Sequence, residues 1–308
     1  MLGICCHYVN EVTKKNGTKE LVNEFDERVL QLGRYRNGKY SIDQITGTYI
    51  HNIKRLIEML PKIRKVSRHF RMSSVLLPLA DQVDRKLWDS DEVRKHLKIA
   101  GDYVKQNEMR LTSHPGQFCV LSSDSPETVK KTIYELEIHG WLFDAMGLDR
   151  SPYYAINIHG GKSDRHDNLV KQINLLPDSV KKRLTLENDE TCYNVPDLLR
   201  VYQDTGVPIC FDSHHFVFNT GHLEMDEAFE ASCATWSDGI NPLQHISNTE
   251  PELANGNFVD RRKHSAYIHY VPECQLKLLQ QNKIDVEVEA KHKQLAVLDM
   301  SRKFNITL

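Results

Sequence analysis

Eight short apolar runs recur along the 308-residue chain, and they constrain its fold more than any other feature. They cover residues 2–6, 70–77, 109–113, 154–158, 183–187, 207–211, 243–247 and 284–289. A parallel strand that is buried on both faces has a continuous run of this kind, rich in Val, Ile and Leu. The runs therefore predict eight parallel strands.

The segments between the runs have the periodicity and the end signals of helices. Residues 41–66 place apolar side chains at helical spacing after Ser41, a capping candidate. Residues 125–147 begin with Ser-Pro-Glu and end at Gly147, which is the pattern of an N-cap, a proline in the first turn and a C-terminal glycine. Residues 194–206 have the same kind of start and end at Gly206. Strands that alternate with helices form parallel βαβ units. We therefore predict an α/β fold, a TIM (β/α)8 barrel, with residues 1–308 as a single domain.

Side chains of metal-binding type end or follow six of the runs. They are His114, His159, Glu187, Asp212, His215, His245 and Glu289. A TIM barrel builds its active site at the C-terminal ends of its strands. Imidazole and carboxylate groups suit Mn and Zn alike. The set therefore predicts two or three divalent metal ions at that end of the barrel.

The prediction depends on the whole set, because a single histidine is more often a hydrogen-bonded residue than a ligand. Glu187 and Glu289 carry more weight, since each lies in an apolar run where an unpaired charge is costly. Glu287 shares a strand face with Glu289. We expect Glu289 to be the ligand because it is nearer the C-terminal end of the run.

Composition narrows the setting of this site. The net charge of −2 excludes a generally basic surface, so any contact with nucleic acid must come from a local patch. No stretch is long and apolar enough to span a membrane, and the N-terminus has no secretory signal. The seven scattered cysteines lack a CxxC pair, and we expect reduced thiols and a cytoplasmic protein. The polar segment 248–263 is either a substrate-contact loop or a solvated one.

Eight segments, in order, resemble motifs of the UV damage endonuclease family. They are FRMSS (70–74), SHPGQF (113–118), NIHGG (157–161), LTLEND (184–189), FDSHHF (211–216), HIS (245–247), HSAYI (264–268) and VEVEAKHK (286–293). SHPGQF and LTLEND are specific, whereas FRMSS and HIS are common. The resemblance spans nearly the whole chain. It implies a TIM barrel related to endonuclease IV that uses Mn or Zn to nick DNA 5′ to a lesion.

The resemblance also implies a division of the ligands among three metal ions. The first ion would be held by His114, His159 and Glu187. Glu187 would bridge to a second ion, held also by Asp212, His245 and Glu289. A third would take His215 and His264, and the expected catalytic residues are Glu187, His245 and Glu289.

The resemblance implies DNA contacts as well. Gln117 and Phe118 correspond to a Gln-Tyr pair that wedges into the duplex where the damaged dinucleotide flips out, a step that costs a few kcal/mol of unstacking. The alternative is an ordinary turn with a packed Phe. Basic residues on the same rim are expected to contact phosphates, namely Lys162, Arg165, Arg262 and Lys263.

Three positions depart from the family pattern. Gln82 stands where many members carry a histidine, and Leu243 stands where the family has a lysine. Ile4 and Cys5 occupy the end of the first run, where a tyrosine is expected. Arg71, inside the second run, is expected to be a structural residue of the barrel.

The sequence thus predicts a monomeric endodeoxyribonuclease that acts on damaged double-stranded DNA. It would cut 5′ to cyclobutane dimers and 6-4 products, and at abasic sites, and leave 3′-hydroxyl and 5′-phosphate ends. Two alternatives stay open. One is a metal-dependent sugar isomerase or epimerase on the same barrel. The other is a damage-binding protein with little or no turnover, suggested by Gln82 and Leu243.

Overall fold

A closed barrel of eight parallel strands forms the centre of the protein in a computed structural model that describes residues 1–116 and 118–308. The strands follow the order β1-β10-β9-β8-β7-β6-β5-β4 around the barrel. Their bounds are β1 (Leu2–Cys5), β4 (His69–Met72), β5 (Arg110–Ser113), β6 (Ile156–His159), β7 (Leu184–Glu187), β8 (Ile209–Asp212), β9 (Leu243–Ile246) and β10 (Asp285–Val288). Each strand overlaps one predicted run, so the predicted TIM-barrel fold is confirmed.

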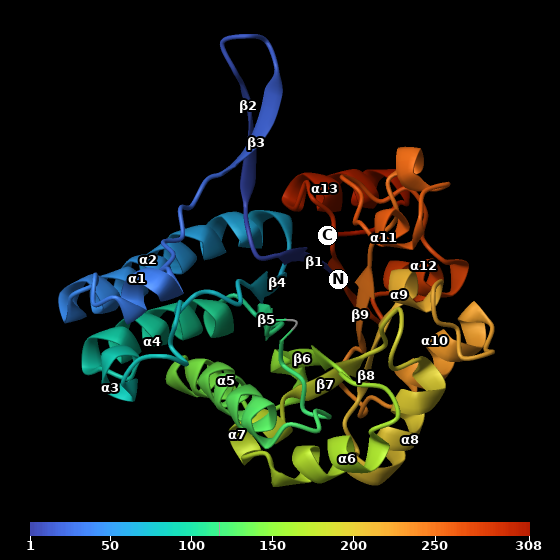
Figure 1. The fold of residues 1–308 in the computed structure, drawn as a ribbon. Coiled ribbons are helices and arrows are strands. Elements are labelled where there is room, and N and C mark those ends of the chain that lie inside the picture. The colour runs from blue at the N-terminus through green and yellow to red at the C-terminus, as the bar shows by residue number, and fades with distance from the viewer. Residues whose placement is uncertain (117) are drawn as a thin grey trace.

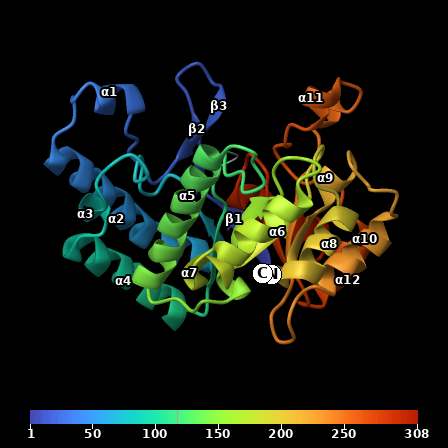
Figure 2. The ribbon, with the colours of Figure 1, turned by 60° about the horizontal axis from the view of Figure 1, so that its bottom comes forward.

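Helices surround the barrel and cover its strands (Figures 1 and 2). Their bounds are α1 (Leu32–Arg36), α2 (Ile42–Val66), α3 (Arg85–Trp88), α4 (Asp91–Gln106), α5 (Pro126–Ala145), α6 (His166–Leu175), α7 (Asp178–Lys181), α8 (Val195–Thr205), α9 (Ser213–Phe216), α10 (Met225–Cys233), α11 (Phe258–Arg261), α12 (Glu273–Gln280) and α13 (Gln294–Lys303). The three helices predicted from sequence are α2, α5 and α8. Their N-caps are the expected Ser41, Ser125 and Asn194, each of which accepts a hydrogen bond from a backbone N–H of the first turn.

A two-stranded antiparallel hairpin, β2 (Val9–Thr13) and β3 (Lys19–Asn23), is not among the predicted elements. It follows β1 and projects away from the barrel (Figure 1). Most of its side chains are exposed on both faces, so its sequence has no apolar alternation to indicate strands. The turn contains Asn16-Gly17, with Gly17 at φ 83°, which is a common hairpin signal.

The segment 248–263, predicted to be irregular, contains two short helical turns, η2 (Pro251–Leu253) and α11. An isolated bridge joins Thr249 to His264 across the base of this segment. The loop therefore returns the chain to the rim of the barrel, beside one of the predicted ligands.

Alternate strand residues have opposite surroundings. Outward-facing side chains such as Phe70, Leu111 and Leu186 are buried in an apolar core shared with the helices. The intervening residues face the barrel interior, and many of them are polar and fully buried. At the N-terminal end of the barrel, Arg110 Nη1 lies 2.8 Å from Asp285 Oδ2, and the N-terminal amine lies 2.8 Å from Asp285 Oδ1. The interior is therefore a column of polar groups that leads up to the C-terminal strand ends.

Candidate metal centre

The C-terminal strand ends bring together three neighbouring groups of ligand-type atoms. Within each group, the atoms lie within 4.8 Å of one another. The groups are His114–His159–Glu187, Glu187–Asp212–His215 and Asp212–His245–Glu289. Glu187 and Asp212 each belong to two groups, so the three form one continuous cluster. Seven of the eight predicted ligands are in it.

These side chains come from the C-terminal ends of strands β5 to β10, the residues that directly follow them and helix α9. The histidine rings pack closely, with centroids of His114 and His159 5.3 Å apart and those of His159 and His215 5.5 Å apart. The sequence brings them together because parallel strands of a barrel end at the same rim.

Glu187 lies at the middle of the cluster and is 1% exposed. Its Oε2 accepts a hydrogen bond from His114 Nε2 at 3.1 Å, and its Oε1 lies 3.1 Å from His245 Nδ1 and 3.4 Å from His215 Nε2. Burial disfavours the charged carboxylate, but the charges of His245 and His159 outweigh it and hold the pKa of Glu187 well below its usual range. Glu187 is therefore an anion whose two oxygens face different histidines, as a bridging ligand requires.

Two atoms of the cluster fit a cation because they lack other partners. Asp212 Oδ1 caps α9 by accepting hydrogen bonds from the backbone N–H groups of His214 and His215, both at 2.7 Å. Its Oδ2 is buried and has no hydrogen-bond partner among the described residues, and the same holds for His159 Nδ1. Buried polar atoms are rarely left unpaired. A set of oxygen and imidazole-nitrogen donors of this kind suits Mn or Zn.

His264 lies at the edge of the cluster and outside the three groups. Its Nδ1 is 3.6 Å from Glu289 Oε2, and its side chain is 34% exposed. Glu289 also contacts Arg71. Burial disfavours the charged form of Glu289, but Arg71, with His245 and His264, lowers its pKa far below the usual range.

Three further residues of the site were not predicted as functional. Glu287 is fully buried and accepts hydrogen bonds from His69 Nε2 at 3.2 Å and Arg71 Nη1 at 3.1 Å. Glu190 lies 3.1 Å from His215 Nδ1 and accepts a hydrogen bond from Arg262 Nε at 2.7 Å. Two features of the sequence could have indicated these residues. Glu287 shares a strand face with Glu289, and Glu190 directly follows the motif LTLEND.

Burial opposes the charge of Glu190, but the contact with His215 lowers its pKa to about 2. Arg71 joins Glu287 to Glu289, so it is part of the site as well as of the barrel. The charged groups of the centre therefore extend one layer beyond the ligand-type atoms.

The residues that depart from the family pattern add no atom to the three groups. Gln82 is exposed, and its side-chain amide donates to Asp81. Leu243 packs in a small apolar cluster with Ala155, Cys210 and Trp236. Cys5 is buried at the end of β1, where burial raises the pKa of its thiol.

Among the described residues, the predicted DNA contacts Phe118, Lys162, Arg165, Arg262 and Lys263 lie in segments of the same rim. Gln117 lies outside the described residues. Phe118 is 81% exposed, which contradicts the alternative of a packed Phe in an ordinary turn. Lys162 and Arg165 both pair with Asp124, and Lys263 pairs with Asp260. Arg262 pairs with Glu190, so each of these four basic side chains contacts an acidic one.

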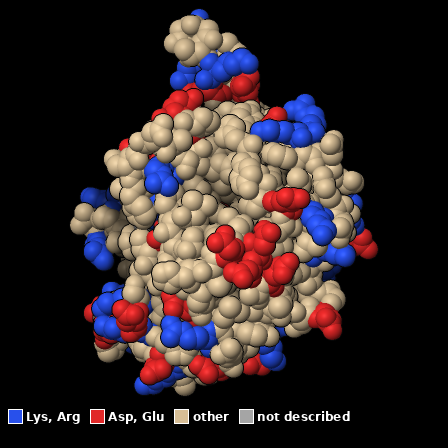
Figure 3. Space-filling model, turned by 90° about the vertical axis from the view of Figure 1, so that its right-hand side faces the viewer, with Lys and Arg blue, Asp and Glu red and all other residues tan. Residues whose placement is uncertain are grey.

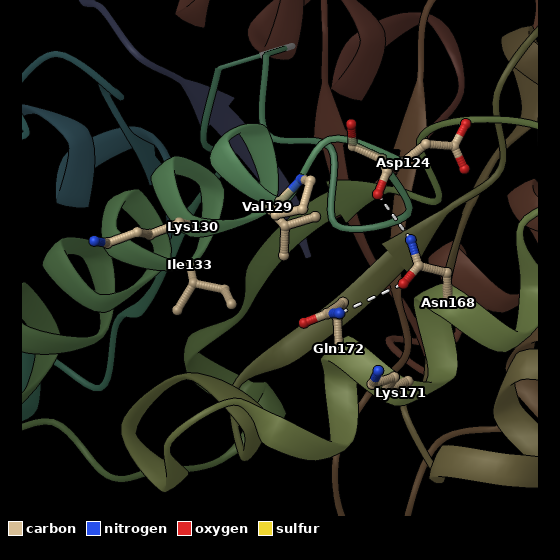
Figure 4. Close-up of a pocket in the computed structure, with 9 residues that line it drawn as sticks. Asp124, Val129, Lys130, Ile133, Asn168, Lys171 and Gln172 are labelled. Atoms are coloured by element: carbon tan, nitrogen blue, oxygen red, sulfur yellow. Dashed lines mark hydrogen bonds between the residues drawn. The ribbon is translucent and has the colours of Figure 1, made fainter.

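A cavity of about 420 Å³ opens beside the cluster and is lined by His159, Lys162, Glu190 and Arg262 among others. A larger cavity of about 470 Å³ lies between α5 and α6, where Val129 and Ile133 face Asn168 and Gln172 (Figure 4). It contains none of the predicted ligands. Of these two cavities, the smaller one therefore reaches a predicted ligand, His159.

Comparisons with known proteins agree with this geometry. The family model described as UV-endonuclease UvdE matches residues 13–307. A UV DNA damage endonuclease of Nostoc sp. is 36% identical over 300 residues, which cover 92% of this chain and 90% of the relative. The crystal structure of SacUVDE has the same fold, with a TM-score of 0.78, 24% identity and coverage of 99% of both chains.

Endonuclease IV from Thermus thermophilus shares the fold more distantly, with a TM-score of 0.56 and 11% identity. The match covers 81% of this chain and 94% of that one. The family model and the Nostoc relative both span nearly the whole barrel, including the strand ends that carry the cluster. The chain therefore belongs to the UV-endonuclease UvdE family.

Proposed function

We propose that this protein is a metal-dependent DNA repair endonuclease that nicks duplex DNA 5′ to UV photoproducts, both cyclobutane dimers and 6-4 products, and at abasic sites. The observation that carries the proposal is the convergence of six imidazole and carboxylate groups around Glu187 in a chain of the UvdE family. Family membership supports the nuclease reaction, and the donor set supports two or three ions of Mn or Zn.

In this proposal, His114, His159 and Glu187 would hold one ion, and Glu187, Asp212, His245 and Glu289 would hold a second. His215 and His264 would complete a third site. Divalent ions bound there would activate water near neutral pH and neutralise the charge that develops on the phosphate during in-line displacement. We expect the cut to leave a 3′-hydroxyl and a 5′-phosphate that stays with the lesion.

The rim supports a contact with distorted duplex DNA. An aromatic ring as exposed as that of Phe118 is free to stack into a gap left by flipped bases, beside Gln117. Lys162, Arg165, Arg262 and Lys263 would exchange their acidic partners for phosphates when DNA binds. We further propose that the enzyme acts as a monomer in the cytoplasm. Within the described residues, no helix has the length and apolarity needed to cross a bilayer.

The test uses a duplex with one site-specific cyclobutane dimer, with Mn or Zn added and with a chelator. We expect a single incision 5′ to the dimer that the chelator abolishes. Glu187→Gln should lower the incision rate by about a thousandfold or more, because metal ligands act as a unit in such sites. Glu58→Gln, an exposed residue of α2 paired with Arg55, is the matched control and should cut normally.

The other outcomes separate the alternatives. Tight binding to the damaged duplex without incision would support a damage-binding protein. Indifference to the duplex, with metal-dependent turnover of a sugar, would support an isomerase or epimerase. Normal incision by Glu187→Gln would contradict the assignment of the metal centre.

A further inference from the structure

Glu287 lies directly beneath the ligand groups, two residues before Glu289 on β10. It is fully buried. Its Oε1 accepts from His69 Nε2 at 3.2 Å and from the hydroxyl of Thr112. Its Oε2 accepts from Arg71 Nη1 at 3.1 Å and lies 3.0 Å from His245 Nε2. A carboxylate has about four lone-pair sites, and three donors already hydrogen-bond to this one, with His245 Nε2 as the fourth neighbouring group. Glu287 is therefore occupied mainly by protein donors, and its remaining capacity faces His245.

His245 lies between Glu287 and the ligand groups, and it is also fully buried. Its Nδ1 is 3.1 Å from Glu187 Oε1 and 3.5 Å from Glu289 Oε1, whereas its Nε2 is 3.0 Å from Glu287 Oε2. Within the described residues, these contacts are close but neither ring nitrogen has a hydrogen-bond partner of good geometry. A neutral imidazole has one lone pair and one N–H, on opposite nitrogens. If Nδ1 is to bind an ion, the proton must be on Nε2.

We propose that Glu287 is a positioning residue that holds the Nε2–H of His245 and so keeps Nδ1 aimed at the metal ions. This inference rests on the proposed metal centre. Histidine ligands commonly donate their other N–H to a carboxylate or carbonyl, and loss of that partner typically weakens metal affinity 10–100-fold. Arg71 strengthens the arrangement because it pairs with both Glu287 and Glu289. Its contact with Glu287 keeps Arg71 from pairing with the ligand Glu289 alone.

The test measures zinc affinity by competition with a chromophoric chelator. Glu287→Gln keeps the shape of the side chain but loses its charge, and we expect zinc affinity to fall about 10–100-fold. Asp285→Asn is the matched control. Asp285 is buried on the same face of the same strand, but its partners are Arg110 and the N-terminal amine, away from the ligands. That variant should lose stability and bind zinc like the wild type.

The outcomes distinguish this inference from the proposal beneath it. A wild-type protein that binds no divalent metal would overturn the proposed function. A wild type that binds zinc, with Glu287→Gln binding equally well, would overturn the role of Glu287. In a His245→Gln background, Glu287→Gln should have little further effect, and an undiminished effect would mean that Glu287 acts through Arg71.

A measurement on the wild type covers the case in which Glu287→Gln fails to fold. In the zinc-loaded protein labelled with 15N-histidine, the resonances of His245 can be assigned by their loss in His245→Gln. We expect a protonated Nε2 and a zinc-bound Nδ1. Zinc on Nε2 would overturn the inference.

Discussion

Individual buried charges serve different purposes at the two ends of this barrel. At the C-terminal end, Glu187 and Glu289 are surrounded by histidines and by Arg71, and they form the candidate metal centre. At the N-terminal end, Asp285 pairs with Arg110 and with the N-terminal amine, far from any ligand group. A buried carboxylate is therefore functional or structural according to its partners.

The pair of Asp285 and Arg110 leads to a pH-dependent prediction. Burial opposes the charge of Asp285, but Arg110 and the amine lower its pKa to about 2. A depressed pKa contributes stability above the unfolded-state value near 4, and that stability is lost as the pH falls towards 2. The contribution is about 2 kcal/mol. Asp285→Asn should cost about 3–5 kcal/mol at neutral pH, because it leaves a buried arginine unpaired.

Urea unfolding of both proteins at pH 6, 4 and 3 measures this effect. The gap in unfolding free energy between wild type and Asp285→Asn should narrow as the pH falls below 4. A gap that stays constant across this range would mean that Asp285 keeps an ordinary pKa.

Whole elements are positioned by close contacts that short sequence patterns do not reveal. Gly101 of α4 shows this, because a Cβ added there would overlap the carbonyl oxygen of Met146 at the end of α5. Gly47, inside α2, has nothing near the position of an added Cβ. Close packing thus requires a glycine at position 101, whereas nothing in the surroundings requires one at position 47.

We expect opposite effects when each glycine is replaced by alanine. Gly47→Ala should stabilise the protein by about 0.5–1 kcal/mol, because alanine is the better helix former. Gly101→Ala should destabilise it by about 1–3 kcal/mol, because α4 and α5 would have to move apart. Thermal unfolding measures both changes, and a shift of the same sign for the two variants would contradict the packing argument.

At the scale of the whole molecule, positive and negative charges nearly balance, with a net charge of −2. The face seen in Figure 3 carries interspersed basic and acidic side chains, with acidic ones gathered at its centre. A chain with a net charge of −2 needs a local basic patch to contact DNA, and we expect that patch in the rim loops. There, Lys162 and Arg165 share the single partner Asp124.

The salt dependence of DNA binding tests this contact. The double variant Lys162→Ala, Arg165→Ala should weaken binding to damaged and undamaged duplexes alike. It should also reduce the slope of log K against log salt by about 1–2, because each phosphate contact contributes about 0.9. Lys181→Ala, Lys182→Ala removes the same charge just before β7, at the opposite end of the barrel, and should leave binding unchanged. An unaltered slope in the rim variant would exclude these residues from the DNA contact.

Much of the fold could be predicted because its signals are local. Each apolar run contains a strand that is buried on both faces. Ser41, Ser125 and Asn194 are helix caps that can be recognised from the residues next to them in the sequence. The hairpin of β2 and β3 escaped prediction because its side chains are exposed on both faces. The role of Glu287 escaped because its partners, His69 and Arg71, lie more than 200 residues away in the chain.

The sequence by itself determined the barrel, since the apolar runs and the helices between them allow few other ways to bury their surfaces. It also determined which ligand-type residues lie at the strand ends, because parallel strands end at one rim. Only the tertiary structure decided how these residues pair. It distinguished Glu289, which lies within a ligand group, from Glu287, which accepts hydrogen bonds from His69, Arg71 and Thr112. The physical reason is that the role of a charge buried in a barrel depends on its partners across the interior. The distance between the charge and those partners is set by the closure of all eight strands.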